Sequence, residues 1–279
     1  MRIAIGDVRL FFDVEGAKLT PDGPVLREKP SLLLLHGGPG FDHSLFKPRF
    51  SKLQDEFQLI YLDHRGNGRS ERGAASQWRL EQWADDVRAF CDTLEIEKPI
   101  VLGVSFGGIV AQAYAARHPD HPGALVLCST TGKFRSDRVL ATFERLGGRE
   151  ARETASLLFD DPSPQTVADY ARVCLPLYTR RPMDPNTLGR CLFNLEVLVS
   201  FFTEEWRSFD LLPALSRVKC RTLVLSGDDD PITPWADGQD LAQALPAATT
   251  RFERFAGCGH PVYEDDEERC FATIREFLK

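Results

Sequence analysis

Residues 99–114 constrain the fold of this chain more than any other stretch. The stretch opens with an apolar run typical of a buried strand and closes, over residues 109–114, with apolar side chains at helical spacing. Between the two lies Gly103-Val-Ser105-Phe-Gly107, which matches the pattern G-x-S-x-G. A strand that turns sharply into a helix strains its middle residue and requires small neighbours, because the chain approaches itself closely. The pattern therefore predicts that Ser105 stands clear at the tip of such a turn, where a nucleophile would be placed.

Short apolar runs alternate with amphipathic segments on both sides of this stretch. Strands are predicted at 31–35, 58–62 and 124–128, and helices at 41–57, with an interruption at Pro48, and at 80–94. This order predicts a mostly parallel sheet with right-handed crossovers and helices on both faces. At the start of the chain, residues 1–14 are expected to form two short antiparallel strands, and residues 15–30 a surface connection.

The pattern changes at about residue 132. Residues 132–215 carry many aromatic side chains and no convincing strand, so we expect an all-helical insertion, or cap, between two parts of one α/β core at 1–131 and 216–279. The alternation then resumes, with strands at 221–225 and 250–255 and helices at 234–245 and 264–278. An insertion at this point would fold over the carboxyl edge of the sheet, and its aromatics would shape an apolar pocket.

A serine hydroxyl at neutral pH needs a histidine to accept its proton and a carboxylate to orient that histidine. His260 follows the last predicted strand, in a loop that could bring it over Ser105, and we predict it to be the base. The alternative is a surface-loop histidine with no partner.

Three adjacent aspartates, Asp228, Asp229 and Asp230, follow the strand at 221–225 and are the candidates for the acid. Asp228 suits the turn itself, where its side chain can bond its own backbone. Asp230, held by Pro231, is better placed to project back over the sheet, so we predict Asp230, with Asp229 as the alternative.

An oxyanion needs preorganised N–H donors. One is predicted from Phe106, directly after Ser105, and the other from Gly38 in the loop His36-Gly-Gly-Pro-Gly40, where adjacent glycines permit close backbone approach. The alternative is that this glycine-rich segment is only a tight turn.

These residues together resemble the α/β-hydrolase superfamily, with the order Ser105, Asp230, His260. Within it, His36-Gly-Gly-Pro-Gly40 and the segment 63–70, DHRGNGRS, resemble the prolyl aminopeptidase (proline iminopeptidase) group. The resemblance implies an α/β-hydrolase fold with a helical cap. A serine at the elbow also argues against the epoxide hydrolases and haloalkane dehalogenases, which share the fold but use aspartate.

The same resemblance implies cap glutamates that hold the free amine of the substrate. Glu196, Glu204 and Glu205 lie in the insertion and are the candidates, although the group's tryptophan-containing motifs do not align here and Phe106 stands where the group usually has tryptophan. The alternative is that these glutamates are solvated surface residues.

Composition limits the partners and the compartment. The formal charge of −7 and the lack of a basic cluster argue against a nucleic-acid partner, and no apolar run is long enough to cross a bilayer. The N-terminal residues lack a signal-peptide pattern, so we expect a cytoplasmic protein. Seven scattered cysteines without a C-x-x-C motif favour reduced thiols over disulfides or metal ligands. We expect neither a metal nor a cofactor.

The sequence thus predicts a serine hydrolase that cleaves an acyl bond of a small molecule or short peptide through an acyl-enzyme on Ser105. Removal of an N-terminal proline or a similar small residue is the first hypothesis, and a carboxylesterase or lactonase the second. A third is a ligand-binding module on the same fold without turnover. Perhydrolase activity as a side reaction is left open.

Overall fold

An eight-stranded sheet forms the centre of the protein. The computed structural model describes residues 1–182, 184 and 186–279. The strands lie in the order β1-β2-β6-β5-β7-β8-β9-β10; β1 and β2 are antiparallel to their neighbours and the rest are parallel. Their bounds are β1 Arg2–Ile5, β2 Val8–Glu15, β5 Ser31–Leu35, β6 Gln58–Leu62, β7 Ile100–Val104, β8 Ala124–Cys128, β9 Arg221–Gly227 and β10 Thr250–Phe255. The predicted mostly parallel sheet is confirmed.

The central strands are buried on both faces. In β5, Leu33 and Leu35 belong to one hydrophobic core, whereas Leu32 and Leu34 belong to the other. Successive side chains of a strand point to opposite faces, so a run of four leucines contributes side chains to both cores. This double burial explains why these strands appear in the sequence as continuous apolar runs.

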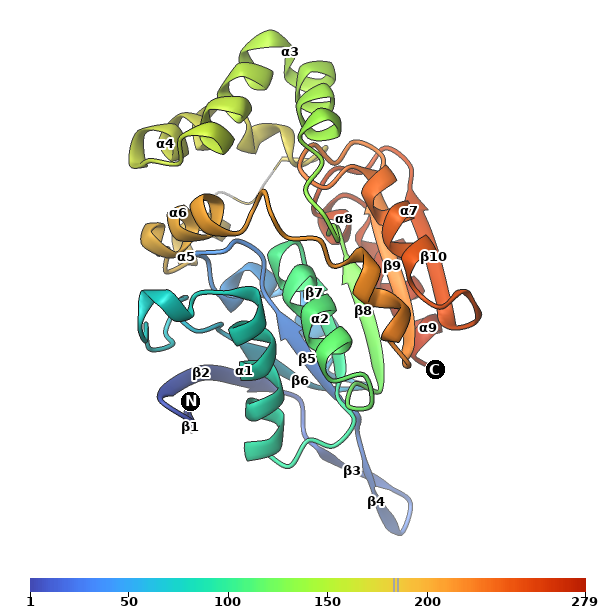
Figure 1. Ribbon diagram of the computed structural model, residues 1–279. Coiled ribbons are helices and arrows are strands. Elements are labelled where there is room, and N and C mark those ends of the chain that lie inside the picture. The colour runs from blue at the N-terminus through green and yellow to red at the C-terminus, as the bar shows by residue number, and fades with distance from the viewer. Residues whose placement is uncertain (183, 185) are drawn as a thin grey trace.

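Helices cover both faces of the sheet (Figure 1). On one face lie α1 (Leu80–Thr93), α2 (Phe106–Arg117) and α7 (Trp235–Ala244), whose buried side chains join the first core. On the other face lie α9 (Glu267–Leu278) and the 3₁₀ helices η1 (His43–Phe46) and η2 (Arg49–Leu53), which join the second core. The three-layer arrangement leaves the carboxyl ends of β7, β8 and β9 for the connecting loops.

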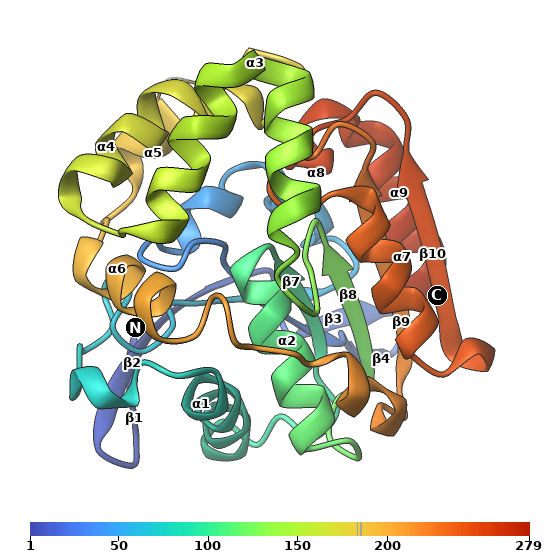
Figure 2. The ribbon, with the colours of Figure 1, turned by 45° about the horizontal axis from the view of Figure 1, so that its top comes forward.

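The chain between β8 and β9 is helical, as predicted. It contains α3 (Ser136–Asp160), α4 (Pro164–Val173), η4 (Leu175–Leu177), α5 (Asn186–Arg190), α6 (Leu195–Glu204) and η5 (Leu212–Arg217). Among its described residues the sole β-type pairing is an isolated bridge between Lys133 and Asp210. We call residues 132–215 the helical insertion. Figures 1 and 2 show α3 and α4 beyond the end of the sheet toward which the arrow of β8 points.

Two local predictions were wrong, and a third was right only in part. Residues 15–30 are not only a connection, because β3 (Leu19–Asp22) and β4 (Val25–Glu28) form a hairpin that projects from the body in Figure 1. The predicted helix at 41–57 is instead η1 and η2, since Pro48 lacks an N–H and excludes a continuous helix. The predicted helix at 264–278 is divided into α8 (Val262–Asp265) and α9 by the non-helical backbone of Asp266.

In the described parts of the chain, no helix combines the length and apolar character that a membrane crossing requires.

Candidate active site

Ser105 occupies the turn between β7 and α2. Its φ of 55° and ψ of −120° are a conformation that a residue with a side chain rarely adopts, as the elbow pattern predicts. The flanking glycines are required for space: a Cβ at Gly103 would lie 2.3 Å from the carbonyl oxygen of Gly107, and one at Gly107 would lie 2.0 Å from that of Leu35. The backbone on either side of the serine is therefore packed too closely for a side chain at either glycine.

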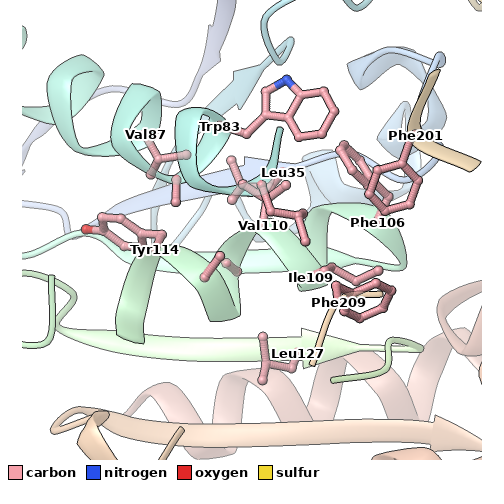
Figure 3. Packing of buried hydrophobic residues seen from close by; sticks show 14 of the residues in the cluster. Leu35, Trp83, Val87, Phe106, Ile109, Val110, Tyr114, Leu127, Phe201 and Phe209 are labelled. Atoms are coloured by element: carbon pink, nitrogen blue, oxygen red, sulfur yellow. The ribbon is translucent and has the colours of Figure 1, made fainter. Parts of the chain in front are cut away.

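Phe106 holds the beginning of α2 in place. Its side chain is buried and makes edge contacts with Trp83 of α1 and Phe201 of α6, at centroid distances of 5.0 and 5.2 Å. Figure 3 shows Phe106 and Phe201 side by side, with Trp83 above the same core. One aromatic ring thus links the elbow, the core helix α1 and the helical insertion.

The two residues predicted as oxyanion donors, Gly38 and Phe106, line the cavity that contains Ser105. Gly37 and Gly38 line the same cavity as Ser105, and a Cβ at Gly37 would be 3.4 Å from the Ser105 Cβ. Phe106 is the first residue of α2, so its N–H has no acceptor within the helix. Gly38 has a φ of +130°, which favours glycine. The loop after β5 is therefore more than a turn, because it forms part of the cavity wall beside the elbow.

His36 fixes this loop as a neutral imidazole. Its Nδ1 donates to the carbonyl of Gly37 at 2.8 Å, and its Nε2 accepts from the N–H of His64 at 3.2 Å. Burial lowers the pKa of His36 and lowers that of His64 well below its ordinary value. Both ring nitrogens of His36 are engaged within these loops, so His36 braces them rather than serving as the base.

The structure brings His260 and Asp230 together. His260 Nδ1 donates to Asp230 Oδ2 at 2.8 Å, and both side chains are buried. With Nδ1 protonated, Nε2 is the nitrogen that remains to accept a proton. Ser105 and His260 line one cavity. This arrangement fits a serine whose proton passes to an imidazole oriented by a carboxylate.

Asp230 is more completely hydrogen-bonded than the sequence indicated. Its Oδ1 accepts from the N–H groups of Ile232 and Thr233 at 3.0 and 2.9 Å, and its Oδ2 accepts from Thr233 Oγ1 at 2.6 Å. The turn in which an aspartate side chain bonds nearby backbone N–H groups, predicted at Asp228, is therefore formed by Asp230. Asp228 pairs with Arg254 instead.

The alternative acid also lies elsewhere, because Asp229 pairs with Arg145 of α3 at 2.7 Å. Thr233 was missed by the sequence reasoning, although a threonine three residues after an aspartate is a recognisable turn signal.

Two further residues around His260 were not predicted. The carbonyl of Tyr178, in the helical insertion, accepts from the N–H of His260 at 2.7 Å. The carboxylate of Asp265 accepts from the N–H of Gly259 at 2.7 Å, from that of Arg180 at 2.9 and 3.1 Å, and from that of Arg181 at 3.1 Å. The loop that carries His260 is therefore tied to the insertion from both sides, and no sequence motif signals these long-range contacts.

A cavity of about 440 Å³ extends from Ser105 into the helical insertion. Most of its wall is apolar, and the insertion contributes six aromatic side chains. These are Tyr170, Tyr178, Phe193, Phe201, Phe202 and Trp206. Such a wall accommodates a small, largely apolar group beside the serine.

The three predicted amine-binding glutamates do not line this cavity. Glu196 is exposed and pairs with Arg72 at 2.7 Å, and Glu204 is exposed near Arg79 at 3.7 Å. Glu205 accepts from the N–H of Leu80 at 2.9 Å, at the beginning of α1, and burial raises its pKa. A carboxylate is stabilised at a helix N-terminus, which explains the position of Glu205 without a substrate.

All seven cysteines are free, and the residues that the structure describes contain no group of three or more His, Cys, Asp or Glu side chains suited to a metal ion.

Comparison with known proteins places the chain in a family. Residues 30–267 match the family model described as alpha/beta hydrolase fold, so the protein belongs to the α/β hydrolases. It resembles the prolyl aminopeptidases among them. The proline iminopeptidase PfmaB of Pestalotiopsis fici is 29% identical, with 96% of this chain and 99% of that protein covered.

Solved structures agree on the fold. The proline iminopeptidase of Mycobacterium smegmatis has a TM-score of 0.79 at 22% identity, covering 100% of this chain and 97% of that one. A thermophilic esterase from Thermogutta terrifontis has a TM-score of 0.71 at 25% identity, covering 100% and 98%. The structural neighbours thus include a protein named as a peptidase and one named as an esterase, and both share this fold.

Proposed function

We propose that this α/β hydrolase cleaves an acyl bond through a covalent intermediate on Ser105. The observation that carries the proposal is the 2.8 Å hydrogen bond between His260 and Asp230 at the wall of the cavity that also contains the strained Ser105. Nucleophile, base and orienting acid follow three different strands, β7, β10 and β9, whose carboxyl ends meet at one edge of the sheet.

In this proposal His260 Nε2 takes the proton of Ser105 as the hydroxyl attacks the substrate carbonyl. The N–H groups of Phe106 and Gly38 stabilise the oxyanion, and Asp230 stabilises the imidazolium that forms. His260 then protonates the leaving group. Water, activated by the same imidazole, hydrolyses the acyl-enzyme and restores Ser105.

The test is the variant Ser105→Ala. Wild-type protein should react with a fluorophosphonate probe and hydrolyse short p-nitrophenyl esters, and the variant should do neither while it keeps the wild-type melting temperature. Ordinary labelling or turnover in the folded variant would overturn the role of Ser105. A ligand that binds to the wild type without being consumed, with no acylation, would support the non-catalytic alternative.

For the substrate we propose an N-terminal proline or a similar small residue, as in the prolyl aminopeptidases that the chain resembles. The relatives named proline iminopeptidase support this assignment, and residues 132–215 would then act as the cap that closes the amino-acyl pocket. The experiment compares hydrolysis of proline β-naphthylamide with that of its N-acetylated form. A required free amine supports the peptidase assignment.

A carboxylesterase or lactonase is the second candidate. The observation in its favour is the mostly apolar cavity wall, from which Glu196, Glu204 and Glu205 are absent. This candidate predicts faster hydrolysis of small neutral esters or lactones than of any aminoacyl amide. It also predicts that N-acetylation of an aminoacyl substrate does not lower its rate of hydrolysis.

A further inference from the structure

The cavity beside Ser105 contains one carboxylate that the proposed mechanism does not use. Apart from Glu264, the described residues of its wall include no Asp, Glu, Lys or Arg. Glu264 lies on α8, four residues after His260, so the turn that positions the proposed base also positions this carboxyl group. Its side chain is 11% exposed.

Glu264 is only weakly paired. No described residue donates a hydrogen bond to its carboxylate, and the nearest cation, Arg49 Nε, lies 3.7 Å away, beyond hydrogen-bond distance. Arg49 instead donates through Nη1 to Glu267 at 2.7 Å. The cation nearest to Glu264 is therefore committed to another carboxylate.

The neighbouring carboxylate of Asp265 is much better hydrogen-bonded than that of Glu264. Asp265, next in the sequence, has its carboxylate filled by three backbone N–H groups from the loop of His260 and from the insertion. Asp265 has a clear structural role, whereas Glu264 lines the cavity and its carboxylate accepts no hydrogen bond from the described residues. Two neighbouring acidic residues in one short helix thus have different surroundings.

A poorly paired carboxylate in an apolar wall is costly. Burial is the main cause that raises the pKa of Glu264; the nearby carboxylates of Asp265, Asp184 and Glu267 act in the same direction, and Arg49 opposes them. A cationic ligand would reverse this cost, because it would supply both the opposite charge and the missing donors.

We infer that Glu264 selects substrates that carry a protonated amine, which its carboxylate receives inside the apolar cavity. The inference rests on the proposed function at Ser105 and assigns the cation site to the segment after His260 rather than to the insertion glutamates. An ammonium group offers three N–H donors, and charge-assisted hydrogen bonds are the stronger kind. An anionic substrate group is disfavoured at the same position.

The experiment measures how a cation and a neutral molecule of the same size compete with p-nitrophenyl butyrate hydrolysis. Pentylammonium and 1-pentanol are the probes, at mildly alkaline pH, where the amine is charged. Wild type should bind pentylammonium about tenfold to a hundredfold more tightly than 1-pentanol. Glu264→Gln should lose most of this preference while it keeps the wild-type melting temperature.

Glu268→Gln is the matched control, because it removes an exposed negative charge of the same acidic run that does not line the cavity. It should keep the preference for pentylammonium. Equal inhibition by the two probes in wild type would overturn the inference without any variant, and so would an unchanged preference in folded Glu264→Gln.

Failure of the proposed function has a different signature. If wild type neither hydrolyses the ester nor reacts with the fluorophosphonate, Ser105 is not the nucleophile, and calorimetric titration of wild type and Glu264→Gln with pentylammonium then decides the role of Glu264 separately. Binding that is lost in Glu264→Gln would support the cation site. Equal binding to wild type and Glu264→Gln would overturn it.

Discussion

The backbone carbonyl of Tyr178 accepts a 2.7 Å hydrogen bond from the N–H of His260, and the two rings meet edge to face at a centroid distance of 5.0 Å. Tyr178 belongs to the helical insertion and His260 to the core. The position of the proposed base therefore depends on how the insertion packs, so changes that displace Tyr178 should alter catalysis as well as stability.

Gly259→Ala tests this dependence. A Cβ at Gly259 would lie 2.0 Å from the carbonyl oxygen of Tyr178, so either the insertion or the loop of His260 must move. We expect kcat/KM for a p-nitrophenyl ester to fall by more than about tenfold, because small displacements of an acid–base group are costly. Gly189→Ala is the control, since a Cβ there meets nothing within 4 Å. Wild-type kinetics in Gly259→Ala would contradict the prediction.

Thr233→Val tests the support of Asp230. The substitution keeps the shape of the side chain and removes the hydroxyl that donates to Asp230 Oδ2 at 2.6 Å. Because hydrogen bonds to charged groups contribute about 1.5 to 3 kcal/mol, we expect kcat to fall about tenfold with little change in KM.

Steady-state kinetics on a neutral ester measures both parameters. Thr187→Val, at a threonine that lines the cavity without contacting Asp230, should leave kcat nearly unchanged. A change in KM alone for Thr233→Val would indicate that its hydroxyl binds substrate instead.

The sheet and the contact between His260 and Asp230 were predictable, because both follow from local patterns. Strands buried on two faces appear as apolar runs, and loops at the carboxyl ends of parallel strands meet at one edge. The interruption at Pro48 in the segment 41–57 was predictable, but the 3₁₀ form of the two helices was not, because their apolar spacing fits an α-helix equally well.

The residues that complete the site could not be predicted from the sequence, for a different reason. Tyr178 contacts His260 through a backbone carbonyl, which carries no sequence signature, and its position depends on how the insertion meets the core. Glu264 appears in the sequence within an acidic run, Glu264-Asp-Asp-Glu-Glu268, which is ordinarily a solvated helix face. Only the packing of α8 against the cavity separates Glu264 from its neighbours.

Asp86→Ala should strongly destabilise the fold. Asp86 accepts two hydrogen bonds from Arg65, each of 2.8 Å, and the Arg65 side chain is 1% exposed. Removing the aspartate leaves a buried guanidinium without its main partner, which costs about 3 to 5 kcal/mol in the free energy of unfolding. Urea denaturation measures this loss. Asp85→Ala on the same helix breaks surface contacts with Arg117 and His118 and should cost less than about 1 kcal/mol. Equal losses in the two variants would contradict the prediction.

Asp237→Asn should change how stability depends on pH. Asp237 on α7 accepts from Arg138, near the beginning of α3, at 2.7 Å, and so links core and insertion. Burial, together with the weaker effect of Asp240, raises the pKa of Asp237 from 3.8 to about 6 despite Arg138. Between these values the folded protein binds the proton more tightly than the unfolded chain, so this group makes the free energy of unfolding fall as pH rises.

Across this pH range the free energy of unfolding of wild type should fall by about 3 kcal/mol relative to that of Asp237→Asn, whose side chain cannot ionise. Urea denaturation of both proteins, below and above this pH window, measures the difference. Asp240→Asn should keep most of the slope, because burial rather than the second carboxylate is the main cause of the raised pKa. Parallel pH profiles for wild type and Asp237→Asn would show that Asp237 is already ionised in the folded protein throughout the window, and that Arg138 outweighs burial at this contact.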